Sequence, residues 1–132
     1  MWSHYADSHR GICLEFDGHF AFMAQAQKVE YARKRRPINV YVDSEDDAMK
    51  KALLTKSEQW AYEEEWRLIR CEHGPGSVQF RPTNLTGIII GAAASPDVGA
   101  LIEQWACTRT EPFTIYQAKL SKTDYAVDIH RR

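Results

Sequence analysis

The sequence predicts an α+β fold, in which a single mixed sheet of about five to seven strands is covered by two main helices. Two observations predict it. Short segments alternate apolar and polar residues with the two-residue period of a strand, and longer segments between them begin with N-cap residues and repeat apolar residues at helical spacing. The chain has 132 residues, of which 44% are hydrophobic. This length and composition suit one compact domain over residues 1–132.

The N-terminal part of the chain predicts short elements. Residues 2–9 suit a helix. Residues 11–17 then alternate, with Ile12, Leu14 and Phe16 on one face, which is the pattern of a half-buried strand. A helix over 20–27 and strands over 29–31 and 38–42 complete this part.

The middle of the chain predicts a helix followed by a hairpin. Ser44 is a good N-cap, and the three acidic residues after it suit the positive end of a helix that we expect to run toward Trp60. From there the period becomes that of a strand over 65–70. The turn His73-Gly74-Pro75-Gly76 then leads into a partner strand over 77–80.

The C-terminal part predicts a buried strand, a helix and two more strands. The strand over 85–90 ends in three isoleucines, which indicates burial on both faces. Ser95 and Pro96 begin a helix whose apolar side chains recur at helical spacing. Strands over 113–120 and 125–129 follow.

Charge and composition exclude several classes of function. The formal net charge of −1 and a pI of about 6.5 give no global attraction to nucleic acid or to an anionic membrane. No segment reaches the ~18 apolar residues that cross a bilayer. The N-terminus also lacks the pattern of a signal peptide, so we expect a cytoplasmic protein without a membrane partner.

The cysteines and histidines indicate neither a disulfide framework nor a metal site. The three cysteines are widely spaced without a Cys-x-x-Cys pair, and the five histidines lack the spacing of zinc ligands. Cys13 lies in an apolar strand without an adjacent base, which favours a core residue over a nucleophile. We expect no metal and no cofactor.

Residues 56–67 are the densest cluster of chemistry-bearing residues. They include two tryptophans, a tyrosine, three consecutive glutamates and an arginine. The rings favour burial, whereas the charges need water or an opposite charge. The segment therefore predicts a boundary between the core and a site. Residues 2–10 combine large rings with titratable groups in the same way.

Four motifs together resemble a bacterial domain family of unknown function. They are Trp2-Ser3-His4-Tyr5-Ala6, Gly11-Ile12-Cys13-Leu14-x-Phe16, Lys56-Ser57-x-x-Trp60-x-Tyr62-Glu63-x-Glu65-Trp66-Arg67 and Ile89-Ile90-Gly91. The resemblance covers most of residues 1–120, and members of that family usually carry a further segment before the first motif. It implies a shared fold and an association with mobile or phage-defence genes, and it implies no particular reaction.

Six residues of these motifs form a candidate ligand-binding site: His4, Tyr5, Lys56, Glu63, Glu65 and Arg67. His4 and Tyr5 could stack on and hydrogen-bond a nucleotide-like ligand, and His4 could also serve as an acid or base. The alternative is that both pack as part of an N-terminal helix. The catalytic residues, if the chain is an enzyme, stay open.

Glu63 and Glu65 share one face if their segment is a strand. There the two carboxylates could retain one proton for general acid chemistry or hold a divalent cation. The alternative is a structural ion pair between one of them and Arg67. The role of Lys56 is open in the same way, because it could bind an anion or be a solvated lysine.

A run of four cations, Arg33-Lys34-Arg35-Arg36, weakly indicates contact with a phosphate backbone. The acidic stretch 43–47 follows closely. Nucleic acid is therefore the least expected of the partners considered.

We expect from these features a small homo-oligomeric binding or accessory module whose aromatic and acidic cleft recognises a protein or a small molecule. The first alternative is an enzyme that acts on a nucleotide or nucleic acid, such as an NAD-consuming transferase. The second is nucleic-acid binding through residues 33–36. The rings provide more apolar surface than two helices cover, which predicts a homodimer. We also expect Glu65 and His4 to interact in a shared cleft.

Overall fold

The structure, a computed structural model, describes residues 2–19, 23–70, 74 and 76–132. The chain divides into two compact units. The first unit holds Met1–Gly18 and Ser77–Arg132, and the second holds His19–Gly76. The expected single domain over residues 1–132 stays a prediction.

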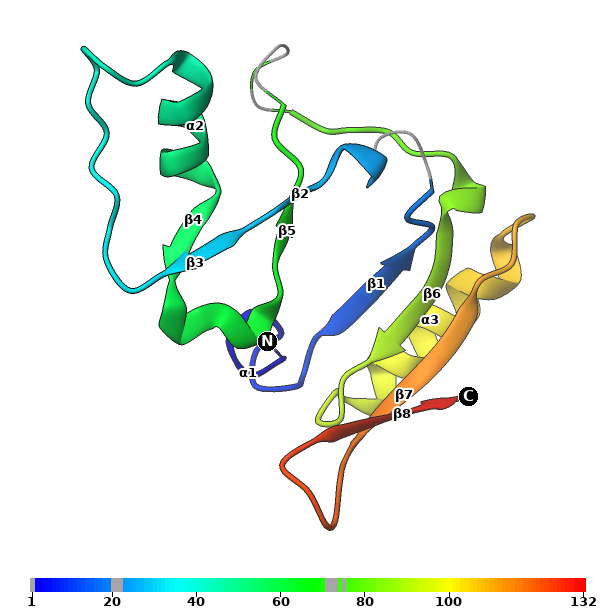
Figure 1. The fold of residues 1–132 in the computed structure, drawn as a ribbon. Helices are drawn as coiled ribbons and strands as arrows, with labels where there is room; N and C mark the ends of the chain where they lie inside the picture. The colour runs from blue at the N-terminus through cyan, green and yellow to red at the C-terminus, as the bar shows by residue number, and fades with distance from the viewer. Residues whose placement is uncertain (1, 20–22, 71–73, 75) are drawn as a thin grey trace. The chain divides into compact units, whose positions relative to one another are not determined.

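The first unit is built on a four-stranded sheet in the order β1-β6-β7-β8 (Figure 1). β6 and β7 are parallel, whereas β1 pairs antiparallel with β6 and β8 pairs antiparallel with β7. Because β6 has a neighbour on each side, its isoleucines are well placed for burial. The strands are β1 (Ile12–Phe16), β6 (Leu85–Ile90), β7 (Thr114–Leu120) and β8 (Val127–Arg131).

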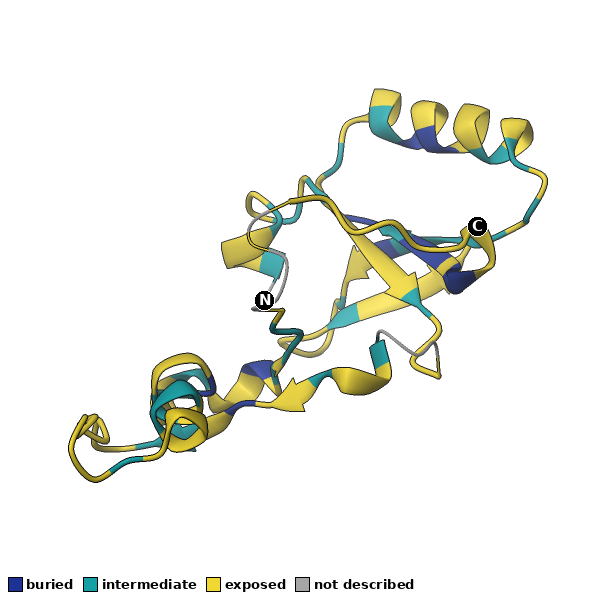
Figure 2. Ribbon diagram, turned by 90° about the horizontal axis from the view of Figure 1, so that it is seen from above, coloured by how far each residue is buried: buried dark blue, intermediate teal, exposed yellow. Residues whose placement is uncertain are grey.

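The helix α3 (Pro96–Thr108) connects the parallel strands β6 and β7 and covers one face of this sheet (Figures 1 and 2). Parallel neighbours need such a crossover because a short turn cannot join them. Ile102 of α3 packs with Leu85, Ile88 and Ile90 to form the buried core of the unit. Within the described ranges, no helix combines the length and the apolarity that crossing a membrane requires.

The N-terminal segment packs against the end of β6. The helix α1 (Trp2–Tyr5) is followed by a turn in which residues 7–9 have φ values between 44° and 67°. Non-glycine residues rarely adopt this left-handed region, and a run of three is strained. The turn is held in place because the Gly91 amide donates to the Gly11 carbonyl oxygen at 2.9 Å.

The second unit contains two two-stranded sheets and one α-helix (Figure 1). β2 (Gln27–Lys28) pairs antiparallel with β5 (Trp66–Arg67). β3 (Glu30–Ala32) pairs in parallel with β4 (Thr55–Ser57), and α2 (Glu45–Leu53) lies between these two strands in the chain.

Short 3-10 helices connect several of these elements. They are η1 (Met23–Gln25), η2 (Glu58–Glu63) and η3 (Pro82–Asn84). η1 and η2 belong to the second unit, whereas η3 precedes β6 in the first. η2 is important for the candidate site because its last residue is Glu63.

The structure confirms the α+β fold class. The two main helices are α2 and α3, and both begin where the sequence predicts. At α2 the Ser44 hydroxyl accepts a hydrogen bond from the Asp47 amide at 3.1 Å, as expected of an N-cap. The expected five to seven strands in one sheet are only approximate, since the largest sheet has four.

The predicted strand over 38–42 is wrong. The Asn39 amide donates to Asp43 Oδ2 at 2.8 Å, and the Asp43 amide donates to the Asn39 carbonyl oxygen at 2.8 Å. These bonds close a turn, and Tyr41 within it is 94% exposed. Asn and Asp favour such turns because their side chains can satisfy nearby backbone groups without a partner strand.

Other predicted elements are shorter than expected. α2 stops at Leu53, because the chain from Thr55 pairs with β3 instead of continuing as a helix toward Trp60. The predicted helix over 2–9 has four residues. The strand predicted over 65–70 reduces to the two residues of β5.

Two of the predicted elements fall partly outside the described residues. The residues outside the description include 20–22 of the predicted helix over 20–27 and residues 73 and 75 of the predicted turn. The described remainder of that helix is η1 followed by the start of β2. Residues 77–80 are predicted to form a strand, and they form none.

Candidate functional site

Four of the six candidate site residues, Lys56, Glu63, Glu65 and Arg67, form one charged network in the second unit. Lys56 lies on β4, Glu63 is the last residue of η2, and Arg67 lies on β5. His4 and Tyr5 are exposed residues of α1 in the first unit. A single site made of all six residues stays a prediction.

Lys56 bridges the two carboxylates of the network. Its Nζ lies 2.5 Å from Glu63 Oε2 and 3.2 Å from Glu65 Oε2. The same ammonium group lies 5.0 Å from the centroid of the Trp60 ring, which is a cation–π distance. The Glu63 side chain is only 1% exposed. Its charge therefore depends on Lys56 for compensation.

Arg67 binds Glu65 from the other side. Its Nε donates to Glu65 Oε1 at 2.6 Å and its Nη2 donates to Oε2 at 3.1 Å, which makes a bidentate pair. Its Nη1 donates to the Leu53 carbonyl oxygen at 2.5 Å. The hydrogen bond from Arg67 and the smaller contribution of Lys56 hold the pKa of Glu65 below its ordinary value.

Glu64 is the residue that makes the two carboxylates converge. It has a φ of 47°, in the left-handed region, and directly follows the end of η2. The Tyr31 hydroxyl then accepts a hydrogen bond from the Glu65 amide at 2.9 Å. Glu63 and Glu65 thus reach the same lysine through a helix end and a left-handed residue, and not through the strand alternation that the sequence suggests.

Pairing of this kind favours the structural interpretation of Glu65 and Arg67 over general acid chemistry. An ionised carboxylate that accepts two bonds from a guanidinium group has no proton to donate. No cluster of three or more His, Cys, Asp or Glu with a geometry suited to a metal ion occurs among the described residues. The ligand-binding roles of these residues stay predictions.

A groove of about 870 Å³ lies in the second unit between the segment that follows β3 and a wall made by the end of α2 and by β4. Half of its lining residues are basic: Arg33, Lys34, Arg35, Arg36, Lys51 and Lys56. The others are Ala32, Pro37, Ile38, Ala52, Thr55 and Ser57. Within the described part of the chain, no carboxylate lines it. We call it the basic groove.

Most of these cations pair with a carboxylate that lies outside the groove lining. The pairs are Arg33 with Glu58 at 3.4 Å, Arg36 with Glu30 at 3.1 Å, Lys51 with Asp43 at 2.6 Å, and Lys56 with Glu63 and Glu65. Lys34 and Arg35 form no ion pair with the residues that the structure describes. Two uncompensated charges in one concave surface attract anions.

The sequence indicated one wall of this groove and not the other. The run 33–36 stands out as four consecutive cations. Lys51 and Thr55 carry no comparable signal, because Thr55 lies on β4, which pairs in parallel with β3, and Lys51 lies on α2, just before that strand. Parallel pairing joins segments that are distant in sequence, and it leaves no local pattern to read.

Cys13 is exposed, which corrects the expectation that it is a core residue. Partial burial, followed by the nearby charge of Glu15, nevertheless raises the pKa of its thiol. A raised pKa disfavours the thiolate, which is the nucleophilic form. This agrees with the interpretation that Cys13 is not a nucleophile.

The basic groove and the charged network lie entirely within residues 31–67. A family model described as a protein of unknown function, DUF2971, matches residues 1–68. The chain belongs to the DUF2971 family. The DUF2971 match confirms the resemblance to a domain family of unknown function over this part of the chain, whereas the link to mobile elements stays a prediction. Neither the curated proteins nor the solved structures that were searched gave a match.

Proposed function

We propose that this chain is a binding module that takes a phosphate-bearing anion in the basic groove. The observation that carries the proposal is the lining, in which six basic side chains meet without a carboxylate among the described residues. Arg and Lys bind phosphate oxygens through charge-assisted hydrogen bonds, and Arg can do so with two parallel bonds. The hydroxyl groups of Thr55 and Ser57 add neutral donors on the opposite wall.

Lys34 and Arg35 are the groups that we expect to contribute most. Both side chains are exposed and neither has an ion-pair partner among the described residues, so an anion displaces no existing bond there. Arg33 and Arg36 do pair with glutamates, but all four of those side chains are at least 59% exposed. Exposed pairs contribute at most about 1 kcal/mol each, so a phosphate group can replace them.

The charged network fixes the position of one residue that lines the groove. Lys56 lines the groove and is held by Glu63, Glu65 and the Trp60 ring. A binding residue that is already fixed loses little side-chain entropy when the ligand arrives. In this account the two glutamates orient a lysine, and they do not themselves contact the ligand.

The proposal is tested by an NMR titration of the ¹⁵N-labelled protein with inorganic pyrophosphate. We expect shifts at amides of residues 32–38 and 55–57, and we expect the double variant Lys34→Glu/Arg35→Glu to lose them because like charges repel the anion. Lys119→Glu/Lys122→Glu makes the same charge change at two exposed lysines of the first unit and should leave the titration unchanged. Equal loss in both double variants would show a diffuse charge effect and contradict a groove.

We propose, as a second and independent part of the function, that the chain forms a homodimer. Several large apolar side chains of the first unit support this, since Leu101, Leu120 and Ile129 are 50% to 66% exposed. Light scattering at micromolar concentration should report twice the chain mass of 15.2 kDa. A constant mass of one chain over that range would remove the dimer and leave the groove proposal intact.

A further inference from the structure

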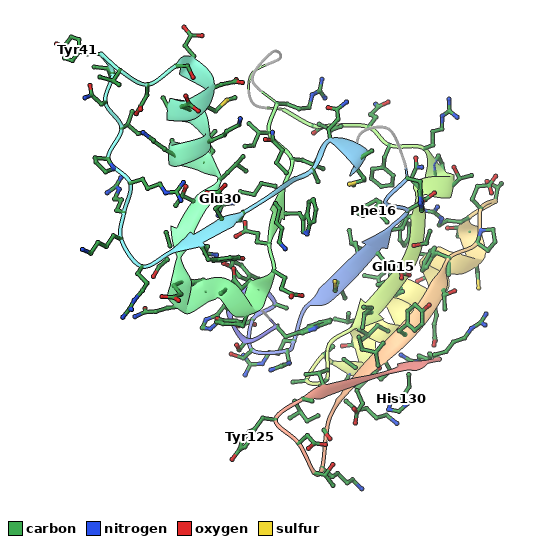
Figure 3. All side chains as sticks on the ribbon, viewed as in Figure 1. Glu15, Phe16, Glu30, Tyr41, Tyr125 and His130 are labelled. Atoms are coloured by element: carbon green, nitrogen blue, oxygen red, sulfur yellow. The ribbon has the colours of Figure 1, made fainter. Side chains whose placement is uncertain are left out.

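We infer that the ligand of the basic groove is single-stranded nucleic acid and that Tyr41 is a stacking platform for one of its bases. The inference rests on the proposed function and adds the class of the ligand. Tyr41 lies at the tip of the loop between β3 and α2, and Figure 3 shows its side chain directed away from that helix. Tyr41 is 94% exposed as a residue, although a tyrosine ring favours at least partial burial.

The turn that carries Tyr41 is fixed by its own hydrogen bonds. The Tyr41 amide donates to Asn39 Oδ1 at 3.1 Å, and Asn39 is bonded to Asp43 twice. Asp43 pairs with Lys51 of α2 at 2.6 Å, which joins the turn to the wall of the groove. A ring on a fixed turn can stack on a base with a small loss of conformational entropy.

Charge changes in one direction along this loop. The cations occupy residues 33–36, apolar side chains occupy four of the five positions 38–42, with Asn39 as the exception, and acidic residues occupy 45–47 at the start of α2. Phosphates fit the first segment and are repelled by the last, so a base and not a phosphate belongs at Tyr41. A cationic groove combined with an exposed aromatic ring is the arrangement with which proteins bind single strands.

The length of the ligand follows from the position of the ring. Tyr41 does not line the basic groove, although Ile38 does. A ligand that contacts both Arg35 and Tyr41 must extend beyond the groove, which a lone phosphate or pyrophosphate cannot do. An oligonucleotide can, because its phosphates repeat along the chain and each base presents a π-face.

The inference is tested by fluorescence anisotropy with a fluorescein-labelled oligo(dT) of twelve nucleotides. Loss of one base-stacking contact costs roughly 1–3 kcal/mol, so Tyr41→Ala should weaken binding by at least about fivefold. Tyr41→Phe retains the ring and should bind like the wild type. Tyr125→Ala is the matched control, because Tyr125 is also fully exposed but lies in the first unit.

Salt dependence separates the two kinds of contact. Each phosphate contact to a single strand contributes about 0.7 to the slope of log affinity against log salt. Lys34→Ala/Arg35→Ala should therefore reduce the magnitude of that slope by about 1.4. Tyr41→Ala should leave the slope unchanged while it lowers the affinity, because stacking releases no counterions.

Four outcomes would overturn the inference. Wild-type affinity in Tyr41→Ala would remove the stacking role, and pyrophosphate shifts without oligo(dT) binding would remove nucleic acid; in both cases the groove proposal survives. Tighter binding of a twelve-residue polyglutamate peptide than of oligo(dT) would assign the groove to an acidic protein. Absence of binding to both oligo(dT) and pyrophosphate would remove the inference together with the proposed function.

Discussion

Lys56 compensates a carboxylate that is almost completely removed from water. Glu63 is 1% exposed on its side chain, and Oε1 of this carboxylate accepts no hydrogen bond from the described residues. Its other oxygen is bonded to Lys56. A buried pair adds little net stability, but removal of one partner leaves an uncompensated charge. The lysine is therefore a structural requirement as well as a lining residue of the basic groove.

Replacement of Lys56 tests this dependence. Lys56→Met should lower the free energy of unfolding by about 3–5 kcal/mol, because the buried Glu63 carboxylate loses its partner. The double variant Lys56→Met/Glu63→Leu should recover much of that loss, since no buried charge remains. Urea unfolding at pH 7 measures both, with Lys119→Met as an exposed control. A single variant within about 1 kcal/mol of wild type would show that Glu63 finds other compensation.

Glu65 should make stability depend on pH in the acidic range. Arg67 and then Lys56 hold its folded-state pKa below the ordinary value of 4.5. A lowered pKa gives a contribution that is complete above pH 4.5 and is lost as the pH falls through the folded-state value. The stability difference between wild type and Glu65→Gln should therefore shrink from pH 7 to pH 3 in urea melts. A difference that stays constant would show that the carboxylate is not held ionised by its partners.

Residue types alone predicted part of the candidate site. The sequence places Lys56, Glu63, Glu65 and Arg67 in one dense segment, and the structure brings these four together. The pattern could not show which charge pairs with which, because that depends on the left-handed backbone at Glu64. Local sequence gives no reliable signal for a non-glycine residue in that region.

At the scale of elements, the turn after α1 and the end of β6 form one close contact in the first unit. A Cβ atom on Gly91 would overlap the carbonyl oxygen of His9 and would lie 2.6 Å from that of Gly11. The glycine is therefore needed for close approach of two backbone segments. The strained residues 7–9 are fixed in part by this contact.

Gly91→Ala should therefore separate the N-terminal turn from β6 at a cost of about 1–3 kcal/mol. Gly18→Ala is the matched control, because nothing lies within 4 Å of a Cβ built there. That control should be neutral or slightly stabilising, since alanine restricts the unfolded chain. Thermal melts of the two variants compare them directly, and equal melting temperatures would contradict the close contact.

The core elements β6 and α3 were predicted well, whereas the strand predicted over 38–42 was not. β6 and α3 form the core of the first unit, and their apolar spacing fixed both their type and their starting residues. Residues 38–42 have an equally good strand pattern, but the hydrogen bonds of Asn39 and Asp43 close them into a turn. Hydrogen bonds from side chains to the nearby backbone compete with strand pairing. The spacing of apolar residues does not reveal such bonds.

For the whole molecule, a net charge of −1 gives no indication of the strongly basic lining of the groove. The acidic residues that balance the total lie elsewhere or pair with cations outside the groove lining. The near-neutral total makes nucleic acid the least expected partner when only the sequence is considered. Local fields depend on the arrangement of charges, so total charge is a poor guide to a groove of this kind.

The central claim is that Lys34 and Arg35 provide the uncompensated charge of a phosphate-binding groove. A crystal structure of the chain grown with inorganic pyrophosphate tests it most directly. We expect the anion between residues 33–36 and the wall formed by Lys51 and Thr55, with phosphate oxygens within hydrogen-bond distance of Lys34 and Arg35. An anion bound elsewhere in a protein whose basic groove holds only water would contradict the account.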